Sequence, residues 1–298
     1  MKEQFLNSRT FAIVGGDQRQ AYLANELAKD GYKVYAILCE ENDLYDFRII
    51  KTDNIKAALE NSNVVIFPLP VTDGDNYINA PFSKREECSE NILTYIKSGT
   101  AVFGGKVSEK FKMDCKKNNI DVVDYLDREE FGILNGIPTA EGAIEIALKE
   151  KATTIWKSKC LISGYGKIAR PLSKTLTAMG ADVEILTRSN KSTALASACG
   201  YKTITSNELK DNIEKYDIVF NTVPSIIFSE EVLKKAHKEC LFIDLASKPG
   251  GIDFECAKFE GIQVIWALSL PGKTAPLTAG SIVKSTIINV LSERGELW

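Results

Sequence analysis

The chain has 298 residues, of which 44% are hydrophobic and 26% are charged, and its formal net charge is −3. This length allows two domains of about 150 residues, each with a full core. So small a net charge gives no electrostatic reason to expect nucleic acid or an anionic membrane as a partner. No apolar run approaches the roughly 20 residues that span a bilayer, and residues 1–10 lack the apolar core of a signal peptide. We therefore expect a cytoplasmic protein.

Cysteine and histidine content limits the possible chemistry. The seven cysteines are scattered and form no Cys-x-x-Cys pair, which is typical of buried thiols in a reducing compartment and predicts neither a disulfide framework nor a metal site. The single histidine, His237, lies among charged residues on an expected surface helix, 231–239, so we expect no catalytic role for it. Acid–base chemistry must then come from Asp, Glu, Lys, Tyr or water.

The first 130 or so residues alternate apolar, strand-like runs with helix-like segments. The expected strands are 10–16, 32–39, 63–67, 100–105 and 120–124, and the expected helices are 21–29 and 108–117. Strands separated by helices predict a parallel sheet that is covered on both faces.

Two strand ends of this first domain carry groups that suit an anion. Residues 15–20 form a Gly-Gly turn into a helix with Arg19 in its first turn, and an arginine fork pairs bidentately with a carboxylate. Residues 104–108 contain a second Gly-Gly pair after a later strand, and Lys106 and Ser108 follow it. These three residues are predicted to bind the substrate.

A long amphipathic helix is expected over residues 137–150, with Pro138 at its entrance. Thr139 and Glu141 would lie in its first turn, close to the connection between the domains. Thr139 is a predicted substrate contact. Glu141 is a candidate general base, but a carboxylate in a first helical turn is also favourable for dipole reasons alone.

Residues 159–170 form a strand that runs into a Gly-x-Gly-x-x-Ala turn at the start of a helix. Gly164 permits the tight turn, Gly166 lets backbone amides approach a pyrophosphate, and Ala169 permits close packing of helix on strand. The helix amino terminus suits a phosphate, and the next strand, 181–188, follows at the spacing of a βαβ unit. The predicted dinucleotide contacts at this turn are Gly164, Tyr165, Gly166, Lys167 and Ile168.

The end of the next strand indicates which dinucleotide is bound. A carboxylate there would hold the ribose 2′-hydroxyl of NAD, but this chain has Thr187, Arg188 and Ser189, with Lys191 close behind. A cation and two hydroxyls suit a 2′-phosphate, so we expect NADP(H). The alternative is an ordinary strand-to-helix turn with a surface arginine.

The fourth strand of the second domain ends in residues 221–225, Asn-Thr-Val-Pro-Ser. In such sheets this position lies beside the nicotinamide ribose, and a proline turns the chain away from the ladder. Thr222, Val223 and Pro224 are therefore predicted cofactor contacts. The alternative is a simple strand end.

The fifth strand ends in residues 244–251, whose two glycines imply unusual backbone angles or the close approach of a ligand. Asp244 is expected to hold this loop by hydrogen bonds, while Ser247 or Lys248 faces the substrate. A solvated Lys248 is the alternative.

Residues 268–280 contain two prolines around a glycine, which predicts a non-helical hinge before a last helix from Leu277 to about Arg294. Thr274 caps this helix or contacts the substrate. The predicted domains are 1–137 with 277–298, and 138–276. Together the patterns predict an α/β chain of two doubly wound, Rossmann-like domains, linked by two long helices with a ligand-binding cleft between them.

Several blocks of this sequence, in their order along the chain, resemble the family of dipicolinate synthase A subunits. The blocks are residues 13–20, 137–142, 164–169, 221–225, 244–253 and 270–280. The resemblance implies the last step of dipicolinic acid synthesis in the mother cell of a sporulating bacterium. There dihydrodipicolinate, or its 4-hydroxy-tetrahydro precursor from the lysine pathway, is oxidised to pyridine-2,6-dicarboxylate. It also implies a partner, the flavoprotein-like B subunit of dipicolinate synthase. We assign catalytic roles to Glu141 and Lys248, and we expect a homo-oligomer.

Two other functions fit part of the sequence. An NADP-dependent 2-hydroxy acid or amino acid dehydrogenase would share the two-domain plan, but such enzymes usually employ a histidine, and only His237 is present. A non-catalytic protein that binds NADP(H) and regulates a partner is the second alternative.

Overall fold

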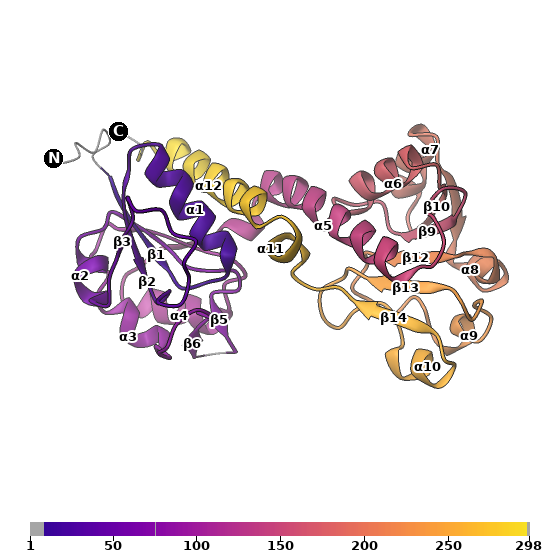
Figure 1. The fold of residues 1–298 in the computed structure, drawn as a ribbon, viewed down its shortest axis with the longest axis horizontal. Coiled ribbons are helices and arrows are strands. Elements are labelled where there is room, and N and C mark those ends of the chain that lie inside the picture. Colours follow the sequence, from indigo (N-terminus) through magenta and orange to yellow (C-terminus); the bar gives the residue numbers. More distant parts are fainter. Residues whose placement is uncertain (1–8, 75, 297–298) are drawn as a thin grey trace. The chain divides into compact units, whose positions relative to one another are not determined.

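The computed structural model describes residues 9–74 and 76–296; most of the segment in which a signal peptide was sought lies outside them. The chain divides into two compact units, one running to Gly132 and resuming at Pro276, the other comprising Ile133–Ala275 (Figure 1). The borders expected from sequence were 137/138 and 276/277. The division at 132/133 falls within a helix, and no local signal in the sequence marks it.

Unit 1 contains a six-stranded parallel sheet in the order β3-β2-β1-β4-β7-β8. Its strands are β1 (Thr10–Val14), β2 (Lys33–Ile37), β3 (Ile50–Lys51), β4 (Val64–Ile66), β7 (Ala101–Gly104) and β8 (Val122–Asp124). A separate antiparallel pair is formed by β5 (Thr72–Asp73) and β6 (Tyr77–Ile78). The strand order reverses direction at β1, beside β4, which is the switch point where open α/β sheets bind ligands.

Helices cover both faces of this sheet. They are α1 (Gln18–Lys29), α2 (Ile55–Glu60), α3 (Ser89–Leu93), α4 (Glu109–Lys117) and α12 (Pro276–Glu293), with the 3-10 turn η1 (Tyr125–Asp127). Phe11 and Ile13 of β1 belong to the core beneath α1 and α12, whereas Ala12 and Val14 belong to the core beneath α2, α3 and α4. The alternation of side chains along a strand therefore produces the doubly wound arrangement that the sequence predicted.

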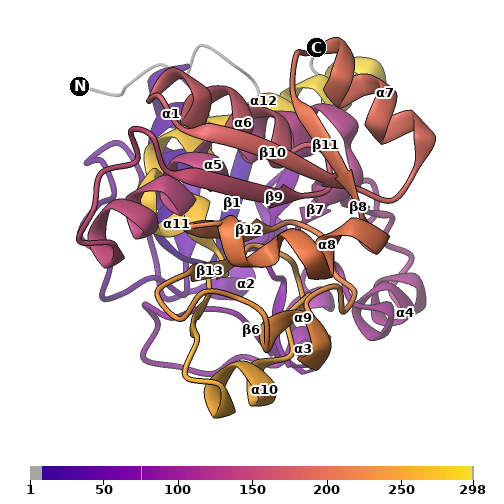
Figure 2. The same cartoon turned by 90° about the vertical axis from the view of Figure 1, so that its right-hand side faces the viewer.

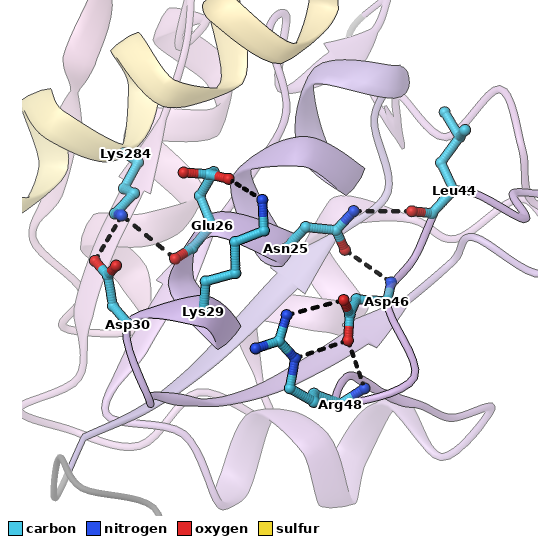
Figure 3. A network of polar contacts seen from close by, with 8 residues as sticks. All are labelled: Asn25, Glu26, Lys29, Asp30, Leu44, Asp46, Arg48 and Lys284. Carbon is cyan, nitrogen blue, oxygen red and sulfur yellow. Dashed lines mark hydrogen bonds and ion pairs between the residues drawn. The ribbon is translucent and has the colours of Figure 1, made fainter.

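The carboxy-terminal helix α12 packs alongside α1 within unit 1 (Figure 1). A Cβ at Gly280 would lie 2.7 Å from the carbonyl oxygen of Arg19, so the two backbones approach closely. Lys284 pairs with Asp30 at 2.5 Å and donates to the carbonyl of Glu26 at 3.3 Å (Figure 3). The last helix therefore belongs to the first domain, as expected.

A loop between β2 and β3 is also held against α1 (Figure 3). Asn25 donates to the carbonyl of Leu44 and accepts from the amide of Asp46, both at 2.8 Å. Arg48 Nε donates to Asp46 Oδ1 at 2.8 Å, and hydrogen bonds from Arg48 lower the pKa of Asp46 to about 2. One amide side chain thus fixes both ends of this loop's central turn.

Unit 2 has a second six-stranded parallel sheet in the order β11-β10-β9-β12-β13-β14. Its strands are β9 (Lys159–Ser163), β10 (Asp182–Thr187), β11 (Lys202–Thr205), β12 (Ile218–Asn221), β13 (Leu241–Asp244) and β14 (Gln263–Trp266). Its helices are α5 (Glu129–Glu150), α6 (Ala169–Ala178), α7 (Asn190–Ala198), α8 (Ser206–Asn212), α9 (Glu230–Leu233), α10 (Phe254–Phe259) and α11 (Leu270–Thr274), with the 3-10 turn η2 (Ile213–Lys215). Figure 2 shows α5 and α6 on one side of this sheet and α9 and α10 on the other, matching the two cores that contain Ile162 and Leu161. The predicted class, α/β with two doubly wound domains, is confirmed.

Three expected helix boundaries are wrong. Helix α5 begins at Glu129, so Pro138 lies inside it and Thr139 and Glu141 are in its middle. The helix is anchored on both sides of the proline, because Phe131 is buried in a core of unit 1 and Ala143 is buried in a core of unit 2. Residues 270–274 are helical, since Pro271 occupies one of the first two positions of α11, where a proline is tolerated. Helix α9 ends at Leu233, so His237 lies beyond it.

All seven cysteines are free thiols, and three depart from the expectation of burial, since Cys88 and Cys256 are half-buried and Cys199 is exposed. Cys199 is exposed because it follows the last turn of the surface helix α7. Among the residues described, no helix has the length and apolar character needed to cross a membrane. Within the same residues, no three His, Cys, Asp or Glu side chains gather where a metal ion could be held.

Candidate functional site

The turn after β9 begins with a glycine whose backbone conformation other residues rarely adopt. Gly164 has a φ of +82°, and its N–H donates to the carbonyl of Leu186 at the end of β10 at 2.8 Å. A Cβ here would lie 3.0 Å from both Thr222 Oγ1 and Val223 Cγ2. The tight-turn role predicted for Gly164 is confirmed by its angle and by this close packing.

The second glycine of the turn borders open space. A Cβ built at Gly166 would have no described atom within 4 Å, and the residue is exposed. The first α-helical hydrogen bond of α6 runs from Arg170 N to Gly166 O at 3.1 Å, so the amides of residues 168 and 169 precede the helical ladder. An open backbone beside the amino end of a ten-residue helix is the geometry that binds phosphate groups.

The side chains of this turn have different surroundings. Tyr165 is 8% exposed, and its ring centroid lies 5.8 Å from that of Tyr201. Burial, followed by a hydrogen bond to Cys199, raises the pKa of Tyr165 to about 12. The phenol is therefore packed and protonated at neutral pH, which leaves the backbone of Tyr165 for any ligand contact. Lys167 is exposed, and Ile168 is half-buried at the amino end of α6.

A pocket of about 280 Å³ opens beside the turn. Residues from the ends of β9, β10 and β12 and from the start of α7 line it: Gly164, Leu186, Arg188, Ser189, Ser192, Val223 and Ile227. Three of these side chains are aliphatic, two are hydroxyls and one is a guanidinium. No carboxylate is among them. The combination suits an apolar ring together with a phosphate, because an arginine makes charge-assisted hydrogen bonds to phosphate oxygens.

The three residues expected to hold a 2′-phosphate divide into two groups. Arg188 and Ser189 line the pocket, and Ser189 also caps α7 by accepting from the amide of Ser192 at 3.2 Å. Thr187 is only 3% exposed, and its hydroxyl is bonded to that of Thr193 at 2.7 Å. The hydroxyl of Thr187 therefore helps to hold the first turns of α7, and its side chain is too buried to contact a ligand.

A fully buried polar network joins the ends of three neighbouring strands. Asn221 of β12 accepts from the hydroxyl of Ser163 on β9 and donates to Asp244 Oδ1 on β13 at 2.7 Å. All three side chains are 0% exposed. Thr222 continues the network, because its hydroxyl donates to the carbonyl of Ser163 at 2.6 Å. The segment that carries Thr222, half-buried Val223 and exposed Pro224 is thereby held at the carboxyl edge of the sheet.

The loop after β13 is fixed by Asp244, as predicted. Its carboxylate accepts from the amide of Ala246 at 3.0 Å and from that of Gly251 at 2.8 Å, one on each side of the loop. A Cβ at Gly251 would lie 2.3 Å from Asn221 Nδ2, which is the close approach that a glycine permits. Ser247 and Lys248 are exposed on this fixed loop.

The corresponding turn of unit 1 is covered by its own chain. A Cβ at Gly15 would lie 2.9 Å from Ala80 Cβ and from the carbonyl oxygen of Asn79, and the amide of Gly16 donates to that same oxygen at 2.8 Å. The first two residues of this turn are therefore packed against residues 79 and 80, and the position that matches Gly166 is occupied by Asp17. The open turn of unit 2 is the better candidate for nucleotide binding.

The guanidinium of Arg19 already has hydrogen-bond partners within unit 1. Its Nε and Nη2 donate to the carboxylate of Asp17 at 2.7–3.0 Å, Nη2 also donates to the carbonyl of Leu69 at 3.0 Å, and the residue is 7% exposed. Burial alone would lower the pKa of Arg19, but hydrogen bonds and the charge of Asp17 outweigh it and raise that pKa. The bidentate fork expected to hold a substrate carboxylate is thus already occupied, because Asp17 lies only two residues away.

Lys106 and Ser108 lie together at the carboxyl end of β7. Ser108 caps α4 by accepting from the amide of Phe111 at 3.2 Å, so its hydroxyl has a structural role. The backbone of Lys106 has a φ of +54° and donates to Asp124 Oδ1 at 3.1 Å, while its side chain is exposed. Of this pair, Lys106 is the one whose charge can meet a ligand.

The candidates on and near α5 also differ in accessibility. Thr139 is 7% exposed, and its hydroxyl donates to the carbonyl of Asn135 at 2.7 Å. Glu141 is exposed and lines an open groove of about 550 Å³. Thr274 is the last residue of α11 and caps no helix. Its hydroxyl donates to Glu145 Oε2 at 3.1 Å.

Four polar residues of this site were not predicted from the sequence: Ser163, Ser192, Asn221 and Ser225. Ser192 has a usable local signal, since it lies three residues after the helix cap Ser189 and therefore faces the same side of the turn. The other three form contacts across separate strands. Such contacts leave no mark in the local pattern.

An open glycine turn, a cation beside an apolar pocket and a doubly wound sheet define a nicotinamide-dinucleotide-binding fold of the dehydrogenase class. Residues 145–267 match the family described as shikimate / quinate 5-dehydrogenase, and residues 10–126 match the N-terminal domain of the dipicolinate synthase A subunit.

Similarity to known proteins extends over nearly the whole chain. The dipicolinate synthase A subunit of Bacillus subtilis (strain 168) is 29% identical over 289 residues, which are 97% of each chain. The crystal structure of the dipicolinate synthase A subunit from Bacillus halodurans superposes with a TM-score of 0.89 at 26% identity, covering 97% of this chain and 99% of that one. The crystal structure of the Bacillus subtilis A chain gives a TM-score of 0.87 at 29% identity, with 97% of both chains covered. Over 97% of its length the chain is therefore similar to dipicolinate synthase A subunits in both sequence and fold.

Proposed function

We propose that this chain is the NADP-dependent catalytic component of a dipicolinate synthase, and that it oxidises dihydrodipicolinate or its 4-hydroxy-tetrahydro precursor to dipicolinate. The observation that carries the proposal is the open turn of unit 2, which lies beside a pocket lined in part by Arg188. The chain is similar to a dipicolinate synthase A subunit over 97% of its length. The names of those relatives, dipicolinate synthase A subunits, support the proposed identity of the substrate.

The residues of unit 2 fit an NADP molecule. Gly166 and the amides at the amino end of α6 would hold the pyrophosphate, and Arg188 with Ser189 would hold the 2′-phosphate. Thr222, Val223 and Pro224 would border the nicotinamide ribose. When bound, NADP⁺ accepts a hydride from the substrate.

Oxidation of the dihydro ring releases one hydride and one proton, and the 4-hydroxy precursor must in addition lose water. The ring becomes aromatic, so the reaction is favourable, and the protein has mainly to orient the substrate, accept the proton and exclude water. We propose Glu141 and Lys248 as the groups that handle the proton. Helix α5 meets the phosphate-binding turn, because a Cβ at Gly136 would lie 2.4 Å from the carbonyl oxygen of Lys167. Glu141 is about 7.5 Å further along that helix.

The substrate has two carboxylates that the chain must hold without a histidine. Lys248 and Ser247 are exposed on the fixed loop after β13, and Lys106 is exposed at the carboxyl edge of the unit 1 sheet. We propose these three residues as anchors. The side chains of Arg19, Ser108, Thr139 and Thr274 already have internal hydrogen-bond partners, so they serve the substrate less directly.

The names of the relatives describe one component of a larger enzyme, which supports a second chain in the active form. We propose that this partner is the flavoprotein-like B subunit of dipicolinate synthase, and that the complex acts in the cytoplasm of the mother cell during sporulation. We also propose that the chain forms a homo-oligomer.

The test supplies the purified chain, with and without the B subunit, with freshly prepared pathway substrate and NADP⁺. Dipicolinate and NADPH should form in equal amounts. Arg188→Ala should weaken NADP⁺ binding roughly tenfold or more, because a charge-assisted pair of about 1.5–3 kcal/mol is lost. Cofactor binding without turnover under every condition would instead favour a regulatory role, and equal affinities of the wild type for NADP⁺ and NAD⁺ would refute the cofactor assignment.

A further inference from the structure

We infer that Ser225 is a positioning residue that sets the preference for NADP(H), because it holds the guanidinium of Arg188 beside the pocket before the cofactor binds. The inference rests on the proposed function, since it requires that Arg188 meets the 2′-phosphate.

A single hydrogen bond joins two sides of the pocket. Arg188 follows directly after β10, and its Nη1 donates to the hydroxyl of Ser225, in the segment after β12, at 2.9 Å. Strands β10 and β12 lie on either side of β9, so this bond passes across the end of β9, where Gly164 forms the turn. Arg188, Gly164 and Val223 all line the pocket. The bond therefore holds the guanidinium, which is exposed to solvent, at the edge of the pocket.

The serine is itself held from the core of unit 2. The amide of Ser225 donates to the carbonyl of Val223 at 2.9 Å, and that carbonyl also accepts from Asn221 Nδ2 at 3.0 Å. Asn221 is 0% exposed and is bonded to the equally buried Asp244. A chain of hydrogen bonds thus leads from the buried network to the hydroxyl that receives Arg188. The backbone that carries this hydroxyl is consequently tied to buried residues of unit 2.

A neutral hydroxyl is well suited to this task. A guanidinium has five N–H donors, and the bond to Ser225 engages only one of its nitrogens. A carboxylate in the place of the serine would orient Arg188 equally well but would cancel its charge and repel a phosphate. Arginine has many rotamers, and ordering such a side chain on binding reduces affinity. Pre-positioning by Ser225 removes part of that cost for NADP(H). It does nothing for NAD(H), which has no 2′-phosphate.

The experiment measures dissociation constants for NADP⁺ and NAD⁺ by calorimetry on the full chain. Ser225→Ala should weaken NADP⁺ binding about three- to tenfold, the usual effect of ordering one long side chain, and should change NAD⁺ binding less than twofold. Ser225→Thr keeps the hydroxyl and should restore most of the NADP⁺ affinity. Ser197→Ala, an exposed serine on α7 that does not line the pocket, is the matched control and should match the wild type.

Arg188→Ala separates this inference from the proposed cofactor. If Arg188→Ala loses NADP⁺ affinity while Ser225→Ala keeps it or gains it, the positioning role of Ser225 is refuted and the cofactor assignment stands. An equal loss of NADP⁺ and NAD⁺ affinity in Ser225→Ala would also refute the positioning role, since it would show a general disturbance of the turn. If Arg188→Ala itself binds NADP⁺ as the wild type does, the cofactor assignment fails and the inference fails with it.

Discussion

Gly166 and Gly164 lie two residues apart, yet the structure gives them different tasks. Gly166 has no positive φ and its Cβ position is open, so a side chain there meets no strain and no neighbour. The same open space is where a pyrophosphate would have to approach. Gly166→Val should therefore leave the thermal midpoint within about 2 °C of the wild type, since a free surface position changes stability by roughly 0.5 kcal/mol or less. NADP⁺ binding measured by calorimetry should be abolished.

Gly164→Val is the matched control at the same turn. Its Cβ would press on Thr222 and Val223 in a backbone conformation that valine disfavours, so this variant should lose stability by about 1–3 kcal/mol. Thermal unfolding distinguishes the two variants. Normal NADP⁺ affinity in Gly166→Val would place the nucleotide elsewhere.

At the scale of elements, two glycines let long helices pack closely. Gly136 in α5 lies against the turn before α6, and Gly280 in α12 lies against α1. Alanine is favoured over glycine in a helix by about 1 kcal/mol, so propensity alone predicts that both Gly→Ala variants gain stability. A Cβ would instead lie 2.4 Å from the carbonyl oxygen of Lys167 and 2.7 Å from that of Arg19, distances at which backbone must shift. Overpacking of about 1–3 kcal/mol should reverse the sign.

We therefore expect both Gly136→Ala and Gly280→Ala to lower the thermal midpoint. Gly136→Ala should also weaken NADP⁺ binding, because the turn that it displaces precedes α6. Gly280→Ala lies in unit 1 and should leave NADP⁺ binding unchanged, so the two variants serve as controls for each other. A higher thermal midpoint in either would mean that helix propensity outweighs the close contact.

At the scale of the whole chain, the two units have similar sheets but different turns after their first strands. Ala80 and Asn79 cover Gly15 in unit 1, whereas the turn at Gly166 in unit 2 is open. Hydrogen exchange followed by mass spectrometry should show that NADP⁺ slows exchange in 164–170, 186–193 and 222–227. A bound ligand stabilises the segments that it contacts.

The segment 15–20 should exchange at the same rate with and without NADP⁺, and it provides the internal control. Protection confined to this segment would assign the nucleotide to unit 1 and would contradict the proposed site. Protection in both units would show that ligand binding also orders unit 1.

The chain's local patterns were enough to predict the two doubly wound sheets, the glycine turn and the arginine beside it. A parallel strand, a helix face and a Gly-x-Gly turn are each encoded within a few consecutive residues, because side-chain periodicity and allowed backbone angles are local properties. Asp244 was also predicted correctly, since a carboxylate beside loop glycines has nearby amides to accept from.

Tertiary contacts decided what each polar side chain is free to do. Arg19 lies in the first turn of α1, where the sequence predicted a substrate anchor, but its fork is occupied by Asp17 and the carbonyl of Leu69 from a distant loop. Thr187 ends the correct strand, but its hydroxyl is turned toward Thr193. Local sequence cannot show which of several hydrogen-bond partners a donor chooses, because that choice depends on what the fold brings near it.

The start of α5 and the contact between Arg188 and Ser225 were decided in the same way. Pro138 is a helix-entrance signal by sequence, yet the helix runs back to Glu129, with Phe131 buried before the proline and Ala143 buried after it. Ser225 stands 37 positions from Arg188 along the chain, and only the pairing of β9 with both β10 and β12 brings them together. The sequence by itself thus determined the fold class and the glycine turn of unit 2, which are encoded in short-range patterns. The hydrogen-bond partners of individual side chains were decided by packing between segments far apart in the chain, where burial and hydrogen bonding outweigh local preference.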